Sequence, residues 1–389
     1  MNPDIPLQLL GGISARVFLR DYWQKKPLLI RQAIPDFQSP IDPDELAGLA
    51  LEEEVESRLV IENGDRPWEM RRGPFAEDAF SELPERDWTL LVQSVDQFVP
   101  EVGELLENFR FLPSWRIDDI MISYAAPGGS VGPHFDNYDV FLLQGHGKRH
   151  WKVGQMCDSQ SPLIEHADLR ILAEFQDSEE WTLEPGDMLY LPPRLAHWGV
   201  AVDECVTYSV GFRAPSAAEV LTHFTDFLSQ FLPDEDRYSD ADAQPVSDPH
   251  QIQHDALDRL KSLLAEHMSD ERLLLTWFGQ FMTEPRYPEL VAGSEDLQEE
   301  DLLASLEQGA VLIRNPSARL AWSEVDDDLL LFASGQSRLL PGHLRELLKL
   351  VCAADALHSE NLEQWLSDEE GRNLLCELVK QGSLGFADE

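Results

Sequence analysis

The sequence predicts an α+β protein: a double-stranded β-helix, or jelly roll, followed by a helical region and a small C-terminal domain of helices and strands. Three observations support this prediction. Residues 117–213 hold short β-rich runs separated by Pro and Gly turns, which is typical of an antiparallel barrel or sandwich. After Pro215, apolar residues recur at helical spacing. Residues 286–389 then alternate between helical and strand patterns, which is typical of a small α+β domain such as a winged helix.

The chain is long enough for several hydrophobic cores. At 389 residues it exceeds the size of one ordinary core, so we expect two or three domains. The pattern along the chain divides it at residues 1–215, 216–285 and 286–389. Hydrophobic residues make up 43% and charged residues 26%, which is ordinary for a globular protein. We expect no membrane span, because no apolar run approaches the length that a bilayer requires.

The N-terminal region is predicted to mix helices and strands. A helix begins at the capping residue Ser14, places apolar side chains on one face as far as Trp23, and ends before Pro27. Residues 28–30 form a short strand, and Pro43 opens a second helix with acidic residues in its first turn.

The central region is predicted to form the jelly roll. Its β-rich runs lie at residues 120–124, 138–143, 150–153, 188–191 and 206–212. Its turn signals lie at residues 127–129, 145–147 and 184–187, each rich in residues that tolerate tight geometry. Short strands at this close spacing favour a barrel over a helical fold.

The remaining chain is predicted to be mainly helical. Helices are expected at residues 217–232, 252–267, 271–282, 298–308, 340–354, 359–367 and 370–381, with strands at 310–313 and 329–332. Residues 233–249 are rich in Asp, Ser, Pro and Ala and should form an exposed connection. The helices of residues 216–285 either form a homodimer interface or pack within one monomer.

Charge and cysteine content restrict the class of function. With 30 basic and 72 acidic side chains the formal net charge is −42, which repels phosphate backbones and attracts basic partners. We therefore expect no direct nucleic-acid binding and a basic protein partner, although the charge can equally serve solubility alone. Four cysteines lack paired spacing, so no disulfide framework or zinc ribbon is indicated. No basic residue precedes Arg16, unlike in a secretory signal, so we expect a cytoplasmic protein.

One His-x-Asp motif stands in a context that suits a metal. The His-x-Asp/Glu matches are His134-Phe135-Asp136, His166-Ala167-Asp168 and His358-Ser359-Glu360. The first follows a Gly/Pro-rich turn and is predicted to enter a strand, where residues i and i+2 face the same side. The other two lie in predicted loop or helix, where i and i+2 do not share a face.

A third ligand is expected from a distant strand, and His197 lies just past one. His134, Asp136 and His197 would then form a facial triad of two imidazoles and one carboxylate. This set leaves positions open on the metal, which suits an Fe(II) enzyme that binds a co-substrate and O₂ together. The alternative is that both histidines are ordinary half-buried residues.

A co-substrate with a free carboxylate needs a fixed cation. Arg149 follows the turn at residues 145–147 on a strand near the metal, and its planar fork suits a carboxylate. Ser123 lies on the preceding strand and could donate a hydrogen bond to the same carboxylate. Met121 and Trp151 are interpreted as barrel core, and Tyr138 as a buried strand residue beside a possible substrate slot.

With these residues in place, the chain resembles the bacterial JmjC-type ribosomal oxygenases of the cupin superfamily. The segments that carry the resemblance are residues 22–27, 43–50, 115–119, 131–134, 138–141 and 208–215. The family's iron ligands match His134, Asp136 and His197, and its 2-oxoglutarate contacts match Ser123 and Arg149. The family layout adds a dimerising helical region and a winged-helix-like domain.

The resemblance implies a 2-oxoglutarate dioxygenase that hydroxylates a basic ribosomal protein. The expected target is an arginine Cβ of large-subunit ribosomal protein sixteen. Three alternatives stay open at this point: a histidine hydroxylase of another ribosomal protein, a cupin enzyme of a different reaction class, and a non-catalytic metal-binding scaffold.

Overall fold

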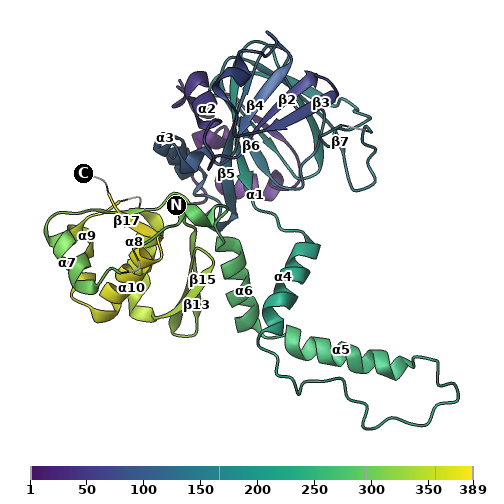
Figure 1. The fold of residues 1–389 in the computed structure, drawn as a ribbon, viewed down its shortest axis with the longest axis vertical. Helices are drawn as coiled ribbons and strands as arrows, with labels where there is room; N and C mark the ends of the chain where they lie inside the picture. Colours follow the sequence, from purple (N-terminus) through teal and green to yellow (C-terminus); the bar gives the residue numbers. More distant parts are fainter. Residues whose placement is uncertain (1, 166, 295, 355, 388–389) are drawn as a thin grey trace. The chain divides into compact units, whose positions relative to one another are not determined.

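The computed structural model describes residues 2–165, 167–294, 296–354 and 356–387. Contacts divide the chain into two compact units, Met1–Ala214 and Pro215–Glu389, here called the N-terminal and C-terminal units. Figure 1 colours the N-terminal unit from purple to teal and the C-terminal unit from teal to yellow. No helix in the described ranges combines the length and apolar character needed to cross a membrane.

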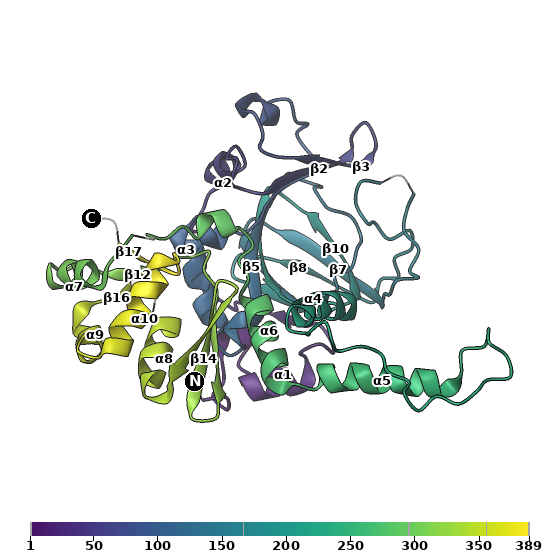
Figure 2. The same ribbon diagram turned by 60° about the horizontal axis from the view of Figure 1, so that its bottom comes forward.

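The N-terminal unit is built from two antiparallel sheets that face each other as a jelly roll (Figure 2), which confirms the predicted fold class. The eight-stranded sheet has, in spatial order, β1 (Leu28–Ile30), β9 (Met188–Leu191), β6 (Val140–His146), β11 (Cys205–Phe212), β5 (Ile117–Ala125), β4 (Trp88–Val92), β2 (Ser57–Asn63) and β3 (Pro67–Arg72). The three-stranded sheet has β10 (Leu195–Ala201), β7 (Arg149–Met156) and β8 (Glu179–Leu183).

Alternation along the strands gives the large sheet two different faces. In β6, Phe141 and Leu143 join the core under the N-terminal helices, whereas Val140 and Leu142 join a core that includes Trp151 of β7. Successive side chains of a strand point to opposite faces, so this alternation separates a helix-covered layer from an inter-sheet layer. The inter-sheet layer is where side chains from both sheets meet.

Short helices cover the outer face of the large sheet. They are η1 (Gln8–Leu10), α1 (Ala15–Asp21), α2 (Pro43–Leu49), η2 (Glu77–Phe80), η3 (Val95–Gln97), α3 (Pro100–Gly103), η4 (Glu104–Phe109) and η5 (Ser114–Arg116). Ser14 caps α1 as predicted, and Asp42 and Glu45 form a capping box at α2. Phe18 of α1 is fully buried among aromatic side chains of the sheet, including Phe141 and Tyr190.

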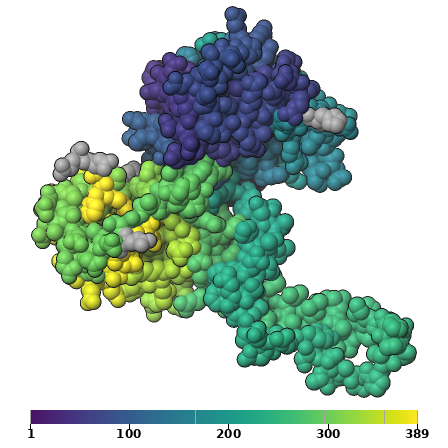
Figure 3. All heavy atoms as spheres, in the orientation of Figure 1, coloured from purple at the N-terminus to yellow at the C-terminus, as the bar shows by residue number. Residues whose placement is uncertain are grey.

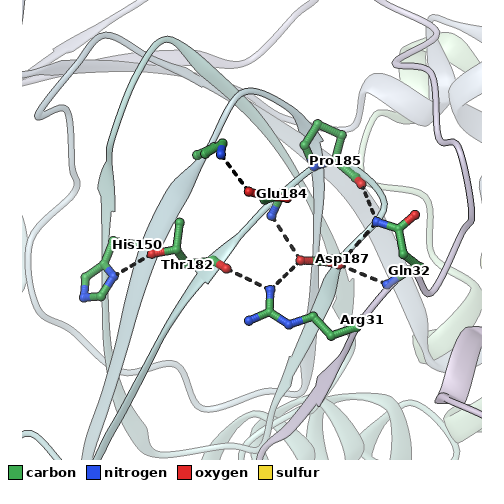
Figure 4. A network of polar contacts seen from close by, with 8 residues as sticks. Arg31, Gln32, His150, Thr182, Glu184, Pro185 and Asp187 are labelled. Atoms are coloured by element: carbon green, nitrogen blue, oxygen red, sulfur yellow. Dashed lines mark hydrogen bonds and ion pairs between the residues drawn. The ribbon is translucent and has the colours of Figure 1, made fainter.

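A buried carboxylate attaches the N-terminal segment to the jelly roll (Figure 4). Asp187, at the turn before β9, accepts hydrogen bonds from the backbone N–H of Gln32 at 2.9 Å and of Glu184 at 3.1 Å. Arg31 contacts the same carboxylate at 2.5 Å and donates to the carbonyl of Thr182 at 2.8 Å. Because Arg31 and Gln32 follow β1 directly, this network fixes the edge strand against β9.

The C-terminal unit begins with helices and ends in a small α+β domain. Its helices are α4 (Ala217–Ser229), α5 (His254–Met268), α6 (Glu271–Thr283), η6 (Pro288–Leu290), α7 (Glu299–Glu307), η7 (Gly342–Leu344), α8 (Arg345–Ala353), α9 (Ser359–Leu366) and α10 (Glu369–Lys380). Its sheets contain β16 (Ala356–Leu357), β12 (Leu312–Arg314) and β17 (Leu384–Phe386), and β13 (Leu320–Val325), β14 (Asp328–Ala333) and β15 (Gln336–Pro341).

Two packing features describe this unit. Phe224 of α4 packs on Trp277 of α6, with ring centroids 5.2 Å apart. In contrast, α5 has no buried residue, and Figure 3 shows it as the green segment exposed along its length. The helix–strand order of residues 286–387 agrees with the predicted winged-helix-like domain.

Several element predictions were wrong in detail. The predicted strand at 138–143 begins two residues later, at Val140, and the predicted helix at 340–354 begins at Arg345 because β15 continues to Pro341. The predicted strand at 310–313 lies at Leu312–Arg314. Strands β2, β3 and β4 were not predicted, although they complete the large sheet. The division into three domains at residues 215 and 285 stays a prediction.

Candidate metal centre and co-substrate site

The first His-x-Asp motif lies on a loop that is tied to β10, not on the strand that the sequence predicts. His134 makes an isolated antiparallel bridge with His197, in which each backbone N–H donates to the other's carbonyl at 3.0 and 2.8 Å. His197 lies past β9, as the sequence predicts, and inside the next strand, β10. The loop continues to Asp136, whose carbonyl accepts from the Arg194 N–H at 2.6 Å. Backbone pairing therefore brings the two segments together despite the 63-position gap in numbering between the histidines.

The side chains of His134, Asp136 and His197 converge. Their ligand atoms all lie within 4.8 Å of one another. Asp136 Oδ2 is 4.0 Å from His134 Nε2 and 3.5 Å from His197 Nε2. Within the described ranges, no other group of histidine, cysteine or acidic side chains meets the same spacing. Two imidazoles and one carboxylate at this separation can hold one ion on a common face.

Backbone carbonyls set the tautomer of both imidazoles. His134 Nδ1 lies 2.8 Å from the carbonyl oxygen of Gly132, and His197 Nδ1 lies 3.0 Å from that of Leu195. A carbonyl oxygen only accepts, so each Nδ1 carries the proton and each Nε2 presents its lone pair toward Asp136. Burial, together with the neighbouring His134, lowers the pKa of His197 to about 4. Its imidazole is therefore neutral at neutral pH, as metal binding requires.

Polar contacts hold the ligand loop at both ends. The buried Ser130 hydroxyl accepts from the Gly132 N–H at 3.0 Å and from Trp198 Nε1, next to His197, at 3.1 Å. At the other end the fully buried Asp139 accepts from the Tyr190 hydroxyl at 2.7 Å and from Gln24 Nε2 at 2.9 Å. The loop between these anchors therefore has little freedom to move His134 and Asp136 away from His197 of β10.

Arg149 is a buried cation without an acidic partner. It begins β7 and is 2% exposed, and no Asp or Glu of the described residues forms an ion pair with it. Nη1 lies 3.4 Å from Ser123 Oγ, and Nη2 lies 3.3 Å from the carbonyl of Gly199. Burial lowers the pKa of Arg149. A buried guanidinium is costly unless it is paired, so this position suits a carboxylate that comes from a ligand.

The inner face of the large sheet is polar around Ser123. Ser123 pairs with Thr207 across β5 and β11, and Thr207 pairs with Gln144 of β6. The Thr207 hydroxyl donates to Gln144 Oε1 at 3.2 Å, and Gln144 Nε2 donates to the His146 carbonyl at 2.8 Å. Sequence reasoning identified Ser123 but missed Thr207 and Gln144. Their positions on the inner face follow only from the strand register.

Tyr138 is not the buried strand residue that the sequence suggested. It lies in the loop before β6 and is 42% exposed. The charge of Asp136, followed by burial, raises the pKa of Tyr138. The Tyr138 hydroxyl therefore lies against Asp136, while the rest of the residue is partly exposed where a protein substrate can contact it.

The other His-x-Asp/Glu motifs do not form comparable sites. His358 is the N-cap residue of α9, and Glu360 lies in the first turn of that helix. Asp168 contacts Arg66 at 3.0 Å, on the β2–β3 side of the unit. His166 lies outside the described residues.

Models of two protein families match this chain. The JmjC domain matches residues 104–220, which include all five candidate site residues. The ROXA-like winged helix matches residues 266–385. The match at the C-terminus agrees with the α+β architecture described above.

Relatives and solved structures cover nearly the whole chain. Ribosomal protein uL16 3-hydroxylase of Escherichia coli is 38% identical, over 94% of this chain and 95% of the relative. A probable ribosomal oxygenase of Haemophilus influenzae is 36% identical over 83% of this chain and 82% of the relative. A structure of E. coli YcfD in complex with cobalt and 2-oxoglutarate has 36% identity and a TM-score of 0.83, covering 96% of this chain and 98% of that one. This chain belongs to the JmjC-domain ribosomal oxygenases.

Proposed function

We propose that this protein is an Fe(II)- and 2-oxoglutarate-dependent dioxygenase that hydroxylates a side chain of ribosomal protein uL16, at the Cβ of an arginine. The observation that carries the proposal is the pairing of two features inside one jelly roll. One is a triad of two histidines and one aspartate, and the other is a buried arginine without an acidic partner among the described residues. Family membership supplies the reaction class.

The proposed metal ligands are His134, Asp136 and His197. Both Nε2 atoms face the Asp136 carboxylate, and both Nδ1 atoms are engaged by carbonyls, so the donor set fits a divalent ion without rearrangement of the backbone. Three protein ligands on one face leave the opposite positions for co-substrate and O₂. When bound, iron supplies the chemistry by which 2-oxoglutarate and O₂ become succinate and CO₂ while one oxygen atom enters a C–H bond.

The proposed co-substrate contacts are Arg149 and Ser123. Strands β10 and β7 are paired, and the partner of Arg149 on β10 is Ala201. Ala201 lies four residues after His197, so the metal ligand and Arg149 are four residues apart along the strands. That is about 13 Å between their Cα positions at 3.3 Å per residue. A five-carbon dicarboxylate together with the long arginine side chain can span this interval. Arg149 would bind the far carboxylate as a fork, and the Ser123 hydroxyl would donate to it.

Charge and exposure support a basic protein substrate. The chain carries a net charge of −42, which favours association with a basic ribosomal protein over nucleic acid. Tyr138 is exposed beside Asp136 and could stack on the planar face of an incoming arginine. With a ribosomal protein as substrate, the reaction would take place in the cytoplasm.

We also propose a homodimer formed through residues 216–285. In α5, Leu257, Leu260 and Leu264 are 46%, 43% and 52% exposed. Their spacing of three and four residues places them on one face of the helix. An amphipathic helix whose apolar stripe stays about half exposed suits association with a second copy.

Succinate formation tests the reaction class. The protein would be incubated with Fe(II), 2-oxoglutarate, ascorbate and uL16, beside a His134→Ala variant as the matched control. We expect succinate in proportion to hydroxylated substrate for the unaltered chain, and none for the variant. Iron binding without any succinate would instead favour the non-catalytic scaffold.

A further inference from the structure

Two neighbouring side chains of the small sheet carry buried N–H donors that meet no protein acceptor. Among the described residues, Arg149 Nε and Trp151 Nε1 have no hydrogen-bond partner although both atoms are inaccessible to solvent. Trp151 itself is 4% exposed. Such donors are rare in folded proteins, because burying one without an acceptor costs free energy. Two of them side by side call for one common explanation.

The two donors belong to one structural unit. Arg149 and Trp151 are two residues apart on β7, so both point to the inner face, and the guanidinium carbon lies 5.1 Å from the Trp151 ring centroid. The Trp151 ring centroid is also 6.1 Å from that of His197. Trp151 therefore lies between the proposed carboxylate anchor and the proposed metal ligand. If Trp151 served only to pack the core, a phenylalanine without a buried N–H would suit this position.

Gly199 makes room for this pair. It faces Trp151 across β10 and β7, and its carbonyl accepts from Arg149 Nη2. A Cβ at position 199 would lie 2.7 Å from Arg149 Nε and 2.7 Å from two ring carbons of Trp151. Any side chain there would push both donors out of place. The absence of a Cβ thus allows the guanidinium and the indole to lie against the strand.

We propose that the Trp151 indole N–H is a third donor of the co-substrate site, and that with Arg149 and Ser123 it binds the far carboxylate of 2-oxoglutarate. This inference rests on the proposed function and adds a residue that sequence reasoning placed in the core. The carboxylate offers several lone pairs, enough for Arg149 Nε–H, Trp151 Nε1–H and the Ser123 hydroxyl together. Arg149 Nε–H and Trp151 Nε1–H, the two buried donors without a partner, then each gain an acceptor when the co-substrate binds.

The test measures co-substrate affinity, not turnover. Calorimetric titration of 2-oxoglutarate into the Co(II)-loaded full-length chain gives a Kd without chemistry, and Trp151→Phe keeps an aromatic ring while removing the N–H. Loss of one hydrogen bond to a charged group should weaken binding about 10- to 100-fold. Gly199→Ala should weaken it at least as much, because both donors move. Co(II) affinity should remain unchanged in Trp151→Phe, since the triad is not altered.

Trp181→Phe is the matched control. Trp181 pairs with Trp151 across β7 and β8 and packs against the same cluster, but its indole nitrogen is not among the buried atoms without a partner. The same loss of ring volume at this position should leave the Kd for 2-oxoglutarate unchanged. Equal weakening in both variants would show that packing alone matters, and would overturn the proposal.

The remaining outcomes are also decisive. If Trp151→Phe does not fold, 3-benzothienylalanine at position 151 keeps the size and shape of the indole and lacks only the N–H, and the same weakening is expected. Unaltered affinity in either replacement overturns the assignment of Trp151 while leaving the proposed function intact. If the unaltered Co(II)-loaded chain binds no 2-oxoglutarate, the proposed function itself fails, and this inference fails with it.

Discussion

At the scale of single residues, Arg149 is the side chain whose surroundings most constrain what the site can bind. It is a cation held 98% out of solvent against a hydroxyl, a carbonyl and the buried Cys205 thiol, with no carboxylate from the described residues in reach. Neutral dipoles do not compensate a buried charge as well as an anion does. The same reasoning explains why the position holds arginine, whose planar fork matches a carboxylate.

We predict that Arg149→Gln raises the Kd for 2-oxoglutarate about 10- to 150-fold, the cost of losing one or more charged hydrogen bonds. Titration of the Co(II)-loaded variant would measure it. The control is Lys148→Gln, because Lys148 is the preceding residue but points to solvent, where it pairs with Glu184. An Arg149→Gln variant that binds 2-oxoglutarate as well as the Lys148→Gln variant would refute the co-substrate assignment.

At the scale of secondary structure, the jelly roll depends on how its edge strand is attached. Asp187 is 3% exposed and binds the two backbone N–H groups and the arginine that hold β1 against β9. Burial alone would raise the pKa of Asp187, but the hydrogen bonds from Gln32, Glu184 and Arg31 outweigh it, and the pKa lies below its usual value. A pKa that folding lowers stabilises the native state above the unfolded pKa.

We predict that Asp187→Asn lowers the free energy of unfolding by about 1–3 kcal/mol, because a buried donor loses its acceptor and Arg31 loses its partner. The contribution of ionised Asp187 to the free energy of unfolding should be present at neutral pH. It should be lost as the pH falls through the lowered pKa of Asp187 in the folded chain. Thermal unfolding of both proteins from pH 7 to pH 3 would measure the difference. Asp177→Asn, at an exposed ion pair with Lys152, is the control and should change stability little. A constant gap between Asp187→Asn and the unaltered chain at every pH would contradict this account.

Local residue patterns predicted part of the site, but not the pairing between distant strands. Residue type, turn signals and the expected strands predicted the triad, Arg149 and Ser123. The structure brings the three triad side chains together, although His134 and Asp136 lie on a loop and not on the expected strand. The roles of these residues as metal ligands and co-substrate contacts stay predictions. The start of β6 was placed two residues too early, and this alone turned the exposed Tyr138 into a supposed core residue. The register that brings Thr207, Gln144 and Gly199 to the site depends on pairing between distant strands, which local pattern does not encode.

At the scale of the whole molecule, the apolar stripe of α5 and the acidic charge lead to separate predictions. For the stripe, we predict that the double variant Leu260→Glu and Leu264→Glu converts a dimer to a monomer, because charges cannot be buried in an apolar contact. Sedimentation at micromolar concentration would measure the mass. Leu339→Glu is the control, since Leu339 is 46% exposed on β15 outside the proposed interface. An unaltered chain that sediments as a monomer would refute the dimer.

For the charge, we predict that KM for uL16 rises several-fold when ionic strength increases from about 0.05 to about 0.5 M, while kcat changes little. Salt screens the attraction between an acidic enzyme and a basic substrate, so the two proteins associate more slowly. The reaction itself takes place inside the jelly roll, where dissolved ions have little effect on its rate. Initial rates at several salt concentrations would measure both constants. A KM that is independent of salt would contradict a role of the −42 net charge in substrate binding.

Whether this protein hydroxylates an arginine of uL16 is measured by mass spectrometry of uL16 after incubation with the protein, Fe(II), 2-oxoglutarate and ascorbate, beside the His134→Ala variant. We predict a mass increase of one oxygen atom, located by fragmentation on a single arginine, and no increase with the variant. An unmodified uL16 in both reactions, despite bound iron and 2-oxoglutarate, would contradict the proposed function. Oxygen on a histidine of another ribosomal protein would keep the reaction class and contradict the proposed substrate.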